Sequence, residues 1–175
     1  MNSLKRFVLC AFAALGLLLP PAAPSHAAPE STMDAIVKRG TLRVGFSSFV
    51  PWAMQDRNGK YIGFEIDVAQ RLADDLGVKL QPVPTSWDGI IPALLAGKFD
   101  MIIGSMAITP KRAMSVNFTV PYDTAYIDVT LNREKAGGIK SLADLNRPEV
   151  VVAVRNGTTA ALAATALVAR ASVRA

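Results

Sequence analysis

The chain has 175 residues, a formal net charge of +5 and a hydrophobic fraction of 51%, and its single cysteine and single histidine are Cys10 and His26. Beyond residue 27 it therefore contains no Ser-His-Asp or Cys-His nucleophile pair and no zinc site with thiolate or imidazole ligands. Its basic residues are scattered in runs no longer than two, so the charge gives no support for nucleic-acid binding.

The first 27 residues have the pattern of a secretory signal peptide. Lys5 and Arg6 are followed by an apolar run at residues 7–19, and Ser25 and Ala27 place small side chains where a signal peptidase cleaves. The apolar run is shorter than the roughly 20 residues that span a bilayer. We therefore expect cleavage after Ala27 and a periplasmic mature chain.

Between residues 31 and 103, helical and strand patterns alternate. Apolar residues at helical spacing and Gly40, Gly77 and Gly97 as stop signals define the helices. This alternation predicts an α/β fold with mainly parallel strands. The expected elements are a helix ending at Gly40, a strand at Thr41–Phe46, a strand at Lys60–Phe64, a helix at Glu65–Leu76, a strand at Val78–Val83, a helix at Asp88–Ala96 and a strand at Phe99–Ile103.

The second half of the chain shows fewer signals. A composition shift around Glu134–Gly138 marks a boundary, which predicts a first lobe at 28–124, a hinge strand at 125–132 and a partial second lobe at 133–175. The expected elements are a strand at Ala125–Leu131, a short helix at Ser141–Leu145, a buried strand at Val150–Val154 and an alanine-rich helix from Thr158 to about Arg170.

The residues that follow the predicted parallel strands form the candidate site. In open α/β sheets, ligands bind outside the carboxyl ends of the strands, and here aromatic rings, hydroxyl groups and two arginines collect in those loops. Such a mixture suits a small polar ligand that carries a carboxylate. The candidate ligand-binding residues are Phe49, Trp52, Trp87, Ser105, Ala107, Arg112, Arg155, Thr158 and Thr159.

Each candidate also has an ordinary structural interpretation. The aromatic residues could belong to the core or its rim, and Arg112 could be a solvated helix charge rather than a bidentate grip on a carboxylate. Thr158 and Thr159 could cap a helix or help its N-terminus to hold an anion. Glu65 and Asp67 lie at a predicted helix start, where acidic residues favour the dipole, so we expect capping rather than acid–base catalysis.

The segment Gly63–Leu76 fills every position of the signature of the bacterial extracellular solute-binding proteins of family 3. The chain resembles these periplasmic amino-acid-binding proteins of ABC importers from Met33 to about Ala163. Further matching segments are Gly40–Gly45, Trp87–Leu94, Gly97–Asp100, Ile108–Arg112, Phe118–Tyr122 and Val152–Thr159.

The resemblance implies a Venus-flytrap fold of the type II periplasmic-binding-protein class, with the first lobe complete and the second partial. It implies that Arg112 holds the α-carboxylate of an amino acid and that Phe49 and Trp87 pack around its side chain. Backbone groups near Ser105 and Ala107 would contact the ligand's α-groups, and the loop at Gly157–Thr159 would complete the carboxylate site. Many relatives carry Ser or Thr where this chain has Ala107, so one hydroxyl contact is missing.

The expected function is capture of a polar amino acid or a related small carboxylate for an inner-membrane ABC permease, by a monomer that needs neither metal nor cofactor and breaks no bond. We expect the short second lobe to impair binding and to leave the strand at Val150–Val154 without sheet neighbours, as in a truncated chain. Two alternatives remain open. They are a periplasmic enzyme of the cyclohexadienyl dehydratase type, on the same fold, and a sensory domain.

Overall fold

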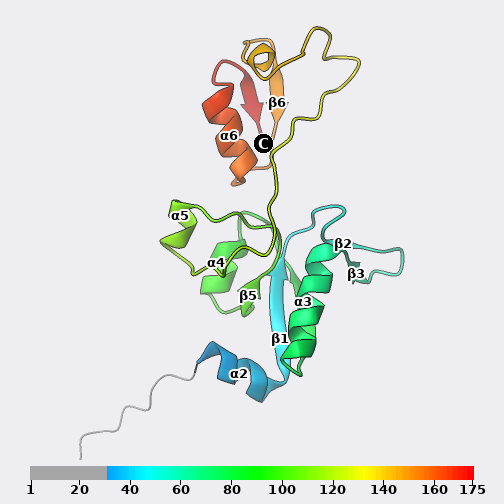
Figure 1. Ribbon diagram of the computed structural model, residues 1–175, viewed down its shortest axis with the longest axis vertical. Coiled ribbons are helices and arrows are strands. Elements are labelled where there is room, and N and C mark those ends of the chain that lie inside the picture. Colours follow the sequence, from blue (N-terminus) through cyan, green and yellow to red (C-terminus); the bar gives the residue numbers. More distant parts are fainter. Residues whose placement is uncertain (1–30) are drawn as a thin grey trace, which may run out of the picture. The chain divides into compact units, whose positions relative to one another are not determined.

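The computed structural model describes residues 31–175, so the predicted signal peptide lies outside the described residues. The described residues alternate helices and strands, as the sequence predicts (Figure 1). The elements up to residue 113 are α2 (Thr32–Arg39), β1 (Thr41–Phe46), β2 (Met54–Gln55), β3 (Tyr61–Ile62), α3 (Phe64–Asp75), β4 (Lys79–Pro84), α4 (Ile90–Leu95), β5 (Met101–Ile102) and α5 (Pro110–Ala113).

A parallel sheet in the order β4-β1-β5 organises the first part of the chain. Strand β1 pairs with β4 along its whole length and with β5 at Val44 and Gly45. As the central strand it is the most buried, and its bounds are those predicted from the sequence. A short antiparallel hairpin of β2 and β3 follows β1, with a turn at Asp56–Gly59 between them.

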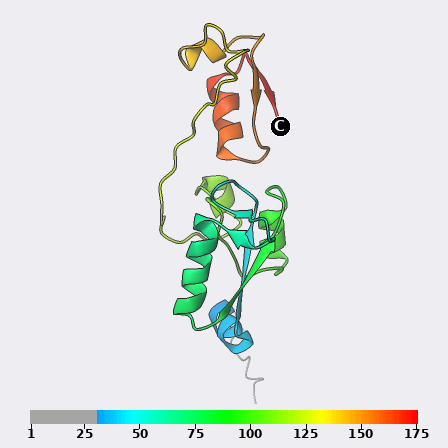
Figure 2. The same cartoon turned by 90° about the vertical axis from the view of Figure 1, so that its right-hand side faces the viewer.

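The two faces of this sheet are covered by different helices. Leu42 and Val44 of β1 pack with Ala69 and Ala73 of α3 in one apolar cluster. On the other face, Phe99 packs over Gly45 of β1 and against Ile90 and Ala93 of α4. Figures 1 and 2 show α3 and α4 on opposite sides of β1. The result is a three-layer α/β arrangement, which leaves the carboxyl ends of the parallel strands uncovered by either helix.

Gly45 is required by this packing. A Cβ added at this position would lie 2.3 Å from the ring of Phe99, closer than side-chain atoms approach one another. Phe99 is 1% exposed, so its ring has little room to move away. The close approach of this ring to the β1 backbone therefore depends on glycine.

The remaining elements lie beyond residue 140. They are the 3-10 helix η2 (Ala143–Leu145), β6 (Val151–Ala153), α6 (Thr159–Leu167) and β7 (Ser172–Arg174). Strand β6 pairs in parallel with β7, so the expectation that Val150–Val154 lacks a sheet neighbour was wrong. The alanine-rich helix ends before the predicted Arg170, because a turn from Val168 to Ala171 redirects the chain into β7.

The predicted hinge strand at Ala125–Leu131 is also wrong. The structure assigns no helix or strand to residues 114–142, and Tyr126, Ile127 and Val129 are exposed. Their β-branched and aromatic composition favours a strand, but a strand is stable only when a neighbour pairs with it. No residue of the described chain pairs with this segment.

Within residues 31–175, none of the helices is both long enough and apolar enough to span a bilayer.

Candidate functional site

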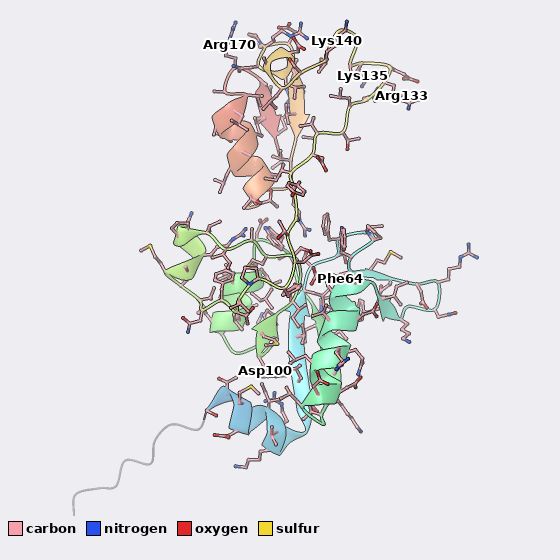
Figure 3. The ribbon with its side chains drawn as sticks, viewed as in Figure 1. Phe64, Asp100, Arg133, Lys135, Lys140 and Arg170 are labelled. Carbon is pink, nitrogen blue, oxygen red and sulfur yellow. The ribbon has the colours of Figure 1, made fainter. Side chains whose placement is uncertain are left out.

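The candidate site lies at the carboxyl ends of β1, β4 and β5. Because the three strands are parallel, the loops that follow them, at 47–53, 85–89 and 103–109, lie along one edge of the sheet. Figure 3 shows Phe64, at the start of α3, near this edge and Asp100 near the opposite end of β1. Asp100 pairs with Arg43 at 2.8 Å, so this ion pair supports the sheet away from the candidate site.

Arg112 is positioned by the short helix α5. Thr109 caps this helix by accepting a hydrogen bond from the Arg112 backbone N–H, and Pro110 occupies the first helical position. The guanidinium donates from Nη1 to the carbonyl of Ala107 at 2.7 Å and from Nη2 to the carbonyl of Gly157 at 3.0 Å. Burial lowers the pKa of Arg112 from its usual value, but arginine remains a cation at neutral pH.

Trp87 lies close to two cationic side chains. The guanidinium carbon of Arg112 is 5.4 Å from the centroid of its ring, and that of Arg155 is 5.7 Å from it. The indole Nε1–H donates to the carbonyl of Gly157 at 3.1 Å. The two distances from the guanidinium carbons to the ring centroid are within the range of a cation–π interaction. Trp87 is therefore a half-buried member of the site rather than a core residue.

Arg155 connects the loop after β6 to the loop after β1. Its guanidinium donates to the carbonyl of Ser48 at 3.2 Å and to the hydroxyl of Ser47. Ser47 is buried, with 5% of its surface exposed. The predicted residues Trp87, Ala107, Arg112 and Arg155 thus form one contact cluster, which we call the arginine cluster, together with Gly157.

Thr158 is the N-cap of α6. Its hydroxyl oxygen accepts a hydrogen bond from the backbone N–H of Ala161 at 3.1 Å and donates to the carbonyl of Arg155 at 2.7 Å. The capping interpretation is confirmed for Thr158, and Thr159 is the first residue of the helix. The free N–H groups of this helix start therefore lie directly after Gly157 in the chain.

Phe49 and Trp52 are half-exposed rather than buried, so neither belongs to the core. Phe49 exchanges two backbone hydrogen bonds of 2.8 Å with Ala53, which closes the loop into a tight bend. Trp52 packs edge-on against Phe64, with ring centroids 5.9 Å apart. The structure therefore places Trp52 against α3 and does not bring it into the arginine cluster.

Glu65 is a residue whose role the sequence analysis missed. It lies in the first turn of α3, as expected for a dipole interaction, but its side chain is buried, with 3% exposed. Its carboxylate accepts hydrogen bonds from the hydroxyl of Ser105 and from the hydroxyl of Tyr122, the latter at 2.6 Å. No spacing pattern connects these three positions in the sequence.

A groove of about 590 Å³ runs beside β5. Met101 and Ile102 line it on the sheet side, and residues 116–125 line it on the other. Ser105 and Ala107 border this groove, whereas Arg112 and Trp87 do not. Ala107 belongs to both, so the groove adjoins the arginine cluster at the loop after β5. Within residues 31–175, no three acidic, histidine or cysteine side chains are grouped as a metal ion would require.

Two curated relatives show how much of the chain is shared with known proteins. The L-cystine-binding protein TcyJ of Escherichia coli K12 is 34% identical over 126 residues, which are 71% of this chain and 47% of that protein. The cyclohexadienyl dehydratase of Pseudomonas aeruginosa is 35% identical over 156 residues, which are 88% of this chain and 57% of that protein. The chain thus spans about half the length of the curated relatives it matches.

Solved structures are also similar to this chain and are likewise matched over part of their length. The ancestral amino-acid-binding protein AncCDT-1, a precursor of cyclohexadienyl dehydratase, superposes with a TM-score of 0.79 at 50% identity, over 82% of this chain and 64% of that one. A point mutant of domain 1 of TmArgBP, in its arginine-bound form, has a TM-score of 0.51 at 46% identity, over 52% of this chain and 71% of that one.

The architecture is therefore that of a type II periplasmic binding protein, with a complete first lobe and part of the second. The model of one protein family matches residues 42–170, which is more than half of the chain. The chain belongs to the bacterial extracellular solute-binding proteins, family 3.

Proposed function

We propose that this chain binds an amino acid in the periplasm, as the substrate-binding component of an ABC importer. The observation that carries the proposal is the arginine cluster at the carboxyl edge of the sheet. There a half-buried guanidinium lies against an aromatic ring and donates to neutral backbone carbonyls rather than to a carboxylate. Such a group binds a small carboxylate more strongly than it binds these carbonyls.

The carboxylate of the ligand is proposed to bind Arg112. The planar guanidinium presents parallel N–H groups that match the two oxygens of a carboxylate. In this arrangement the ligand replaces the carbonyl of Gly157 as the acceptor from Nη2, while Ala107 keeps its bond to Nη1. The N–H groups at the start of α6, near Thr158 and Thr159, supply further donors and the positive end of the helix dipole.

The rest of the ligand is proposed to lie against Trp87 and Phe49. Trp87 is half-buried, and Phe49 is 50% exposed, so both rings have apolar surface that a ligand would cover. Backbone groups near Ser105 and Ala107 would contact the α-groups of the ligand. Arg155 adds a second positive charge near Trp87, which suits a ligand with a polar or acidic side chain. Trp52 is assigned to the rim of the site.

The first lobe is proposed to bind by itself. Domain 1 of TmArgBP is known in an arginine-bound form, so in that protein one domain holds the amino acid without the other. In this chain, Trp87, Ser105, Ala107 and Arg112 all belong to the first lobe, at residues 28–124. Residues 133–175 would add Arg155 and the start of α6. Contacts available only when both lobes meet the ligand would favour a closed state.

The proposal also includes a cellular location and a partner protein. An exported solute-binding protein captures its ligand in the periplasm and delivers it to a permease of the inner membrane, and we propose this role for a monomer of this chain. The family consists of extracellular solute-binding proteins, which supports the location. The predicted signal peptide at 1–27 would provide the export.

Thermal unfolding of the purified chain with each standard L-amino acid in turn tests this proposal. A ligand that binds only the folded chain raises the melting temperature, by an amount that grows with the logarithm of its concentration divided by its Kd. We expect one amino acid, or a few of related structure, to raise it and glycerol at equal concentration to leave it unchanged. A melting temperature that no amino acid changes would overturn the proposal.

A second candidate function is an enzyme on the same fold. The cyclohexadienyl dehydratase of P. aeruginosa is as similar to this chain as the L-cystine-binding protein is. This similarity is the observation that favours the enzyme as a second candidate. Incubation with prephenate or arogenate would produce an aromatic product if the chain were such an enzyme. We propose that no product forms; if one does, the carboxylate of Asp88, which lies beside Gly157, is the candidate acid or base.

A further inference from the structure

Glu65 is a buried carboxylate whose hydrogen-bond partners come from two distant segments. Ser105 follows β5, and Tyr122 lies in the segment of residues 114–142 that has no helix or strand. No lysine or arginine of the described chain forms an ion pair with Glu65. Its charge is instead stabilised by two hydroxyl groups and by the N-terminal end of α3.

The start of α3 is fixed independently of this carboxylate. The backbone N–H of Glu65 donates to the carbonyl of Trp52 at 3.0 Å. Gly63 precedes the helix at a φ of 117°, and a Cβ at this position would lie 2.4 Å from the same carbonyl oxygen. The backbone of Glu65 is thus anchored to the loop after β1, so its side chain can act as a fixed acceptor for other loops.

Ser105 has an unusual backbone conformation. Its φ is 52°, and it is the one residue other than glycine with a positive φ in the described part of the chain. Residues with a Cβ rarely adopt this left-handed conformation, and it persists where neighbouring contacts hold it. Two contacts are found here: the hydrogen bond from the Ser105 hydroxyl to Glu65 and a hydrogen bond between the Ser105 backbone and the hydroxyl of Tyr122.

The conformation of Ser105 sets the path of the loop toward Arg112. Two residues further along the chain, the carbonyl of Ala107 accepts a hydrogen bond of 2.7 Å from Nη1 of Arg112. A change of φ at Ser105 would redirect the backbone at Ala107 and remove this acceptor. The orientation of the guanidinium is therefore linked to the carboxylate of Glu65 through Ser105 and Ala107.

Tyr122 gives the carboxylate a second anchor. Burial raises the pKa of Tyr122 well above the usual range of a phenol, and the hydrogen bond to Glu65 raises it further. The phenol therefore stays protonated and donates to Glu65 throughout the physiological range. Its ring also lies 6.4 Å from that of Phe64, which keeps it beside the start of α3.

We propose that Glu65 is a positioning residue for the amino-acid site, because its carboxylate holds Ser105 in the left-handed conformation that directs Ala107 and Arg112 toward the ligand. The inference rests on the proposed function for the identity of the site.

Hydrogen–deuterium exchange of the full chain, measured for peptides across residues 104–112, tests this role. We expect Glu65→Gln to speed exchange there about tenfold, equivalent to about 1.4 kcal/mol, while exchange in β1 stays unchanged. Equal acceleration in both regions would mean that the residue only stabilises the fold, and no acceleration would mean that it does not hold the loop. Either result overturns the proposal.

A double-mutant cycle with Ser105→Gly shows whether Glu65 acts through Ser105. Glycine adopts a positive φ without strain and has no hydroxyl, so Glu65→Gln should change exchange at 104–112 no further in this background. In a Tyr122→Phe background, by contrast, the about tenfold effect should remain. Additive effects of Glu65→Gln and Ser105→Gly would overturn the proposal.

If Glu65→Gln does not fold, the same exchange measurement can be made on Ser105→Ala. It removes the donor to Glu65 but leaves the carboxylate bonded to Tyr122, and it should give the same local acceleration as Glu65→Gln. Unchanged exchange at 104–112 would overturn the proposal. Since none of these measurements uses a bound amino acid, they are decided separately from the thermal-unfolding test of the proposed function.

Discussion

Nη2 of Arg112 donates a hydrogen bond of 3.0 Å to the main-chain carbonyl of Gly157, a residue that follows β6. The same carbonyl accepts from Nε1 of Trp87 at 3.1 Å. One backbone oxygen thus receives two side-chain donors at the place where we propose that a carboxylate binds. A ligand carboxylate offers these donors a charged acceptor, and charge-assisted hydrogen bonds are roughly twice as strong as neutral ones.

Trp87→Phe tests the contribution of the indole N–H. Phenylalanine keeps an aromatic face for Arg112 and Arg155 but removes the hydrogen bond to Gly157. We expect the amino acid found by thermal unfolding to bind about five- to tenfold more weakly, since one such bond contributes roughly 1 kcal/mol.

Calorimetric titration of that amino acid measures the effect. Tyr61→Phe is the control, because Tyr61 packs edge-on against Phe46, outside the arginine cluster and the proposed site. Equal weakening by both substitutions would show that Trp87 has no special place in the site.

Gly45→Ala tests the packing of the central strand. The added Cβ would lie 2.3 Å from the ring of Phe99, and overpacking of this kind typically costs about 1–3 kcal/mol. We expect the free energy of unfolding, measured in urea, to fall by that amount. Gly104→Ala is the control, since a Cβ there would have no neighbour closer than 3.9 Å. Similar losses at both positions would contradict the packing described here.

Asp100 makes the stability of the fold sensitive to acid. Burial by itself raises the pKa of Asp100, but the hydrogen bonds from Arg43 outweigh it, so that the pKa of this carboxyl lies below its usual value. The folded state therefore binds the proton less readily than the unfolded state, and stability rises with pH. The stabilisation that ionised Asp100 gives to the folded state is complete above the usual aspartate pKa of about 3.9. It is lost as the pH falls through the lowered pKa of Asp100 in the folded state.

Urea unfolding of the wild-type chain and of Asp100→Asn, measured between neutral pH and pH about 3, checks the predicted direction of this pH dependence. We expect the wild-type advantage to shrink as the pH falls. Asp75→Asn is the control, because Asp75 pairs with Arg71 on the exposed face of α3. A difference between the wild type and Asp100→Asn that does not change with pH would contradict the assignment.

The sequence predicted the central part of the fold because local patterns decide it. The alternation in Thr41–Phe46 and the apolar spacing after Gly63 identify β1 and α3 close to their observed bounds. Strand β7 and the absence of a strand at Ala125–Leu131 could not be predicted in this way. Both depend on whether a distant segment pairs with the residues, and pairing leaves no local pattern.

The candidate site shows the same division. The rule that ligands bind at the carboxyl ends of parallel strands located Trp87, Ala107 and Arg112, which the structure brings together. It did not locate Glu65, whose acidic side chain at a helix start already had a local explanation. The hydrogen bond to Ser105 joins positions 40 residues apart and requires a positive φ, and neither is visible in the sequence.

The measurement that tests the central claim most directly is calorimetric titration of the chain with its amino acid and with the corresponding α-carboxamide, in the wild type, Arg112→Ala and Lys111→Ala. We expect the wild type and Lys111→Ala to bind the amino acid equally and the carboxamide far more weakly. Arg112→Ala should bind the amino acid at least about 30-fold more weakly, since loss of one partner of a hydrogen-bonded charge pair costs roughly 2–5 kcal/mol. Unchanged affinity in Arg112→Ala, or equal affinity of the wild type for acid and carboxamide, would contradict the proposal that Arg112 holds the carboxylate.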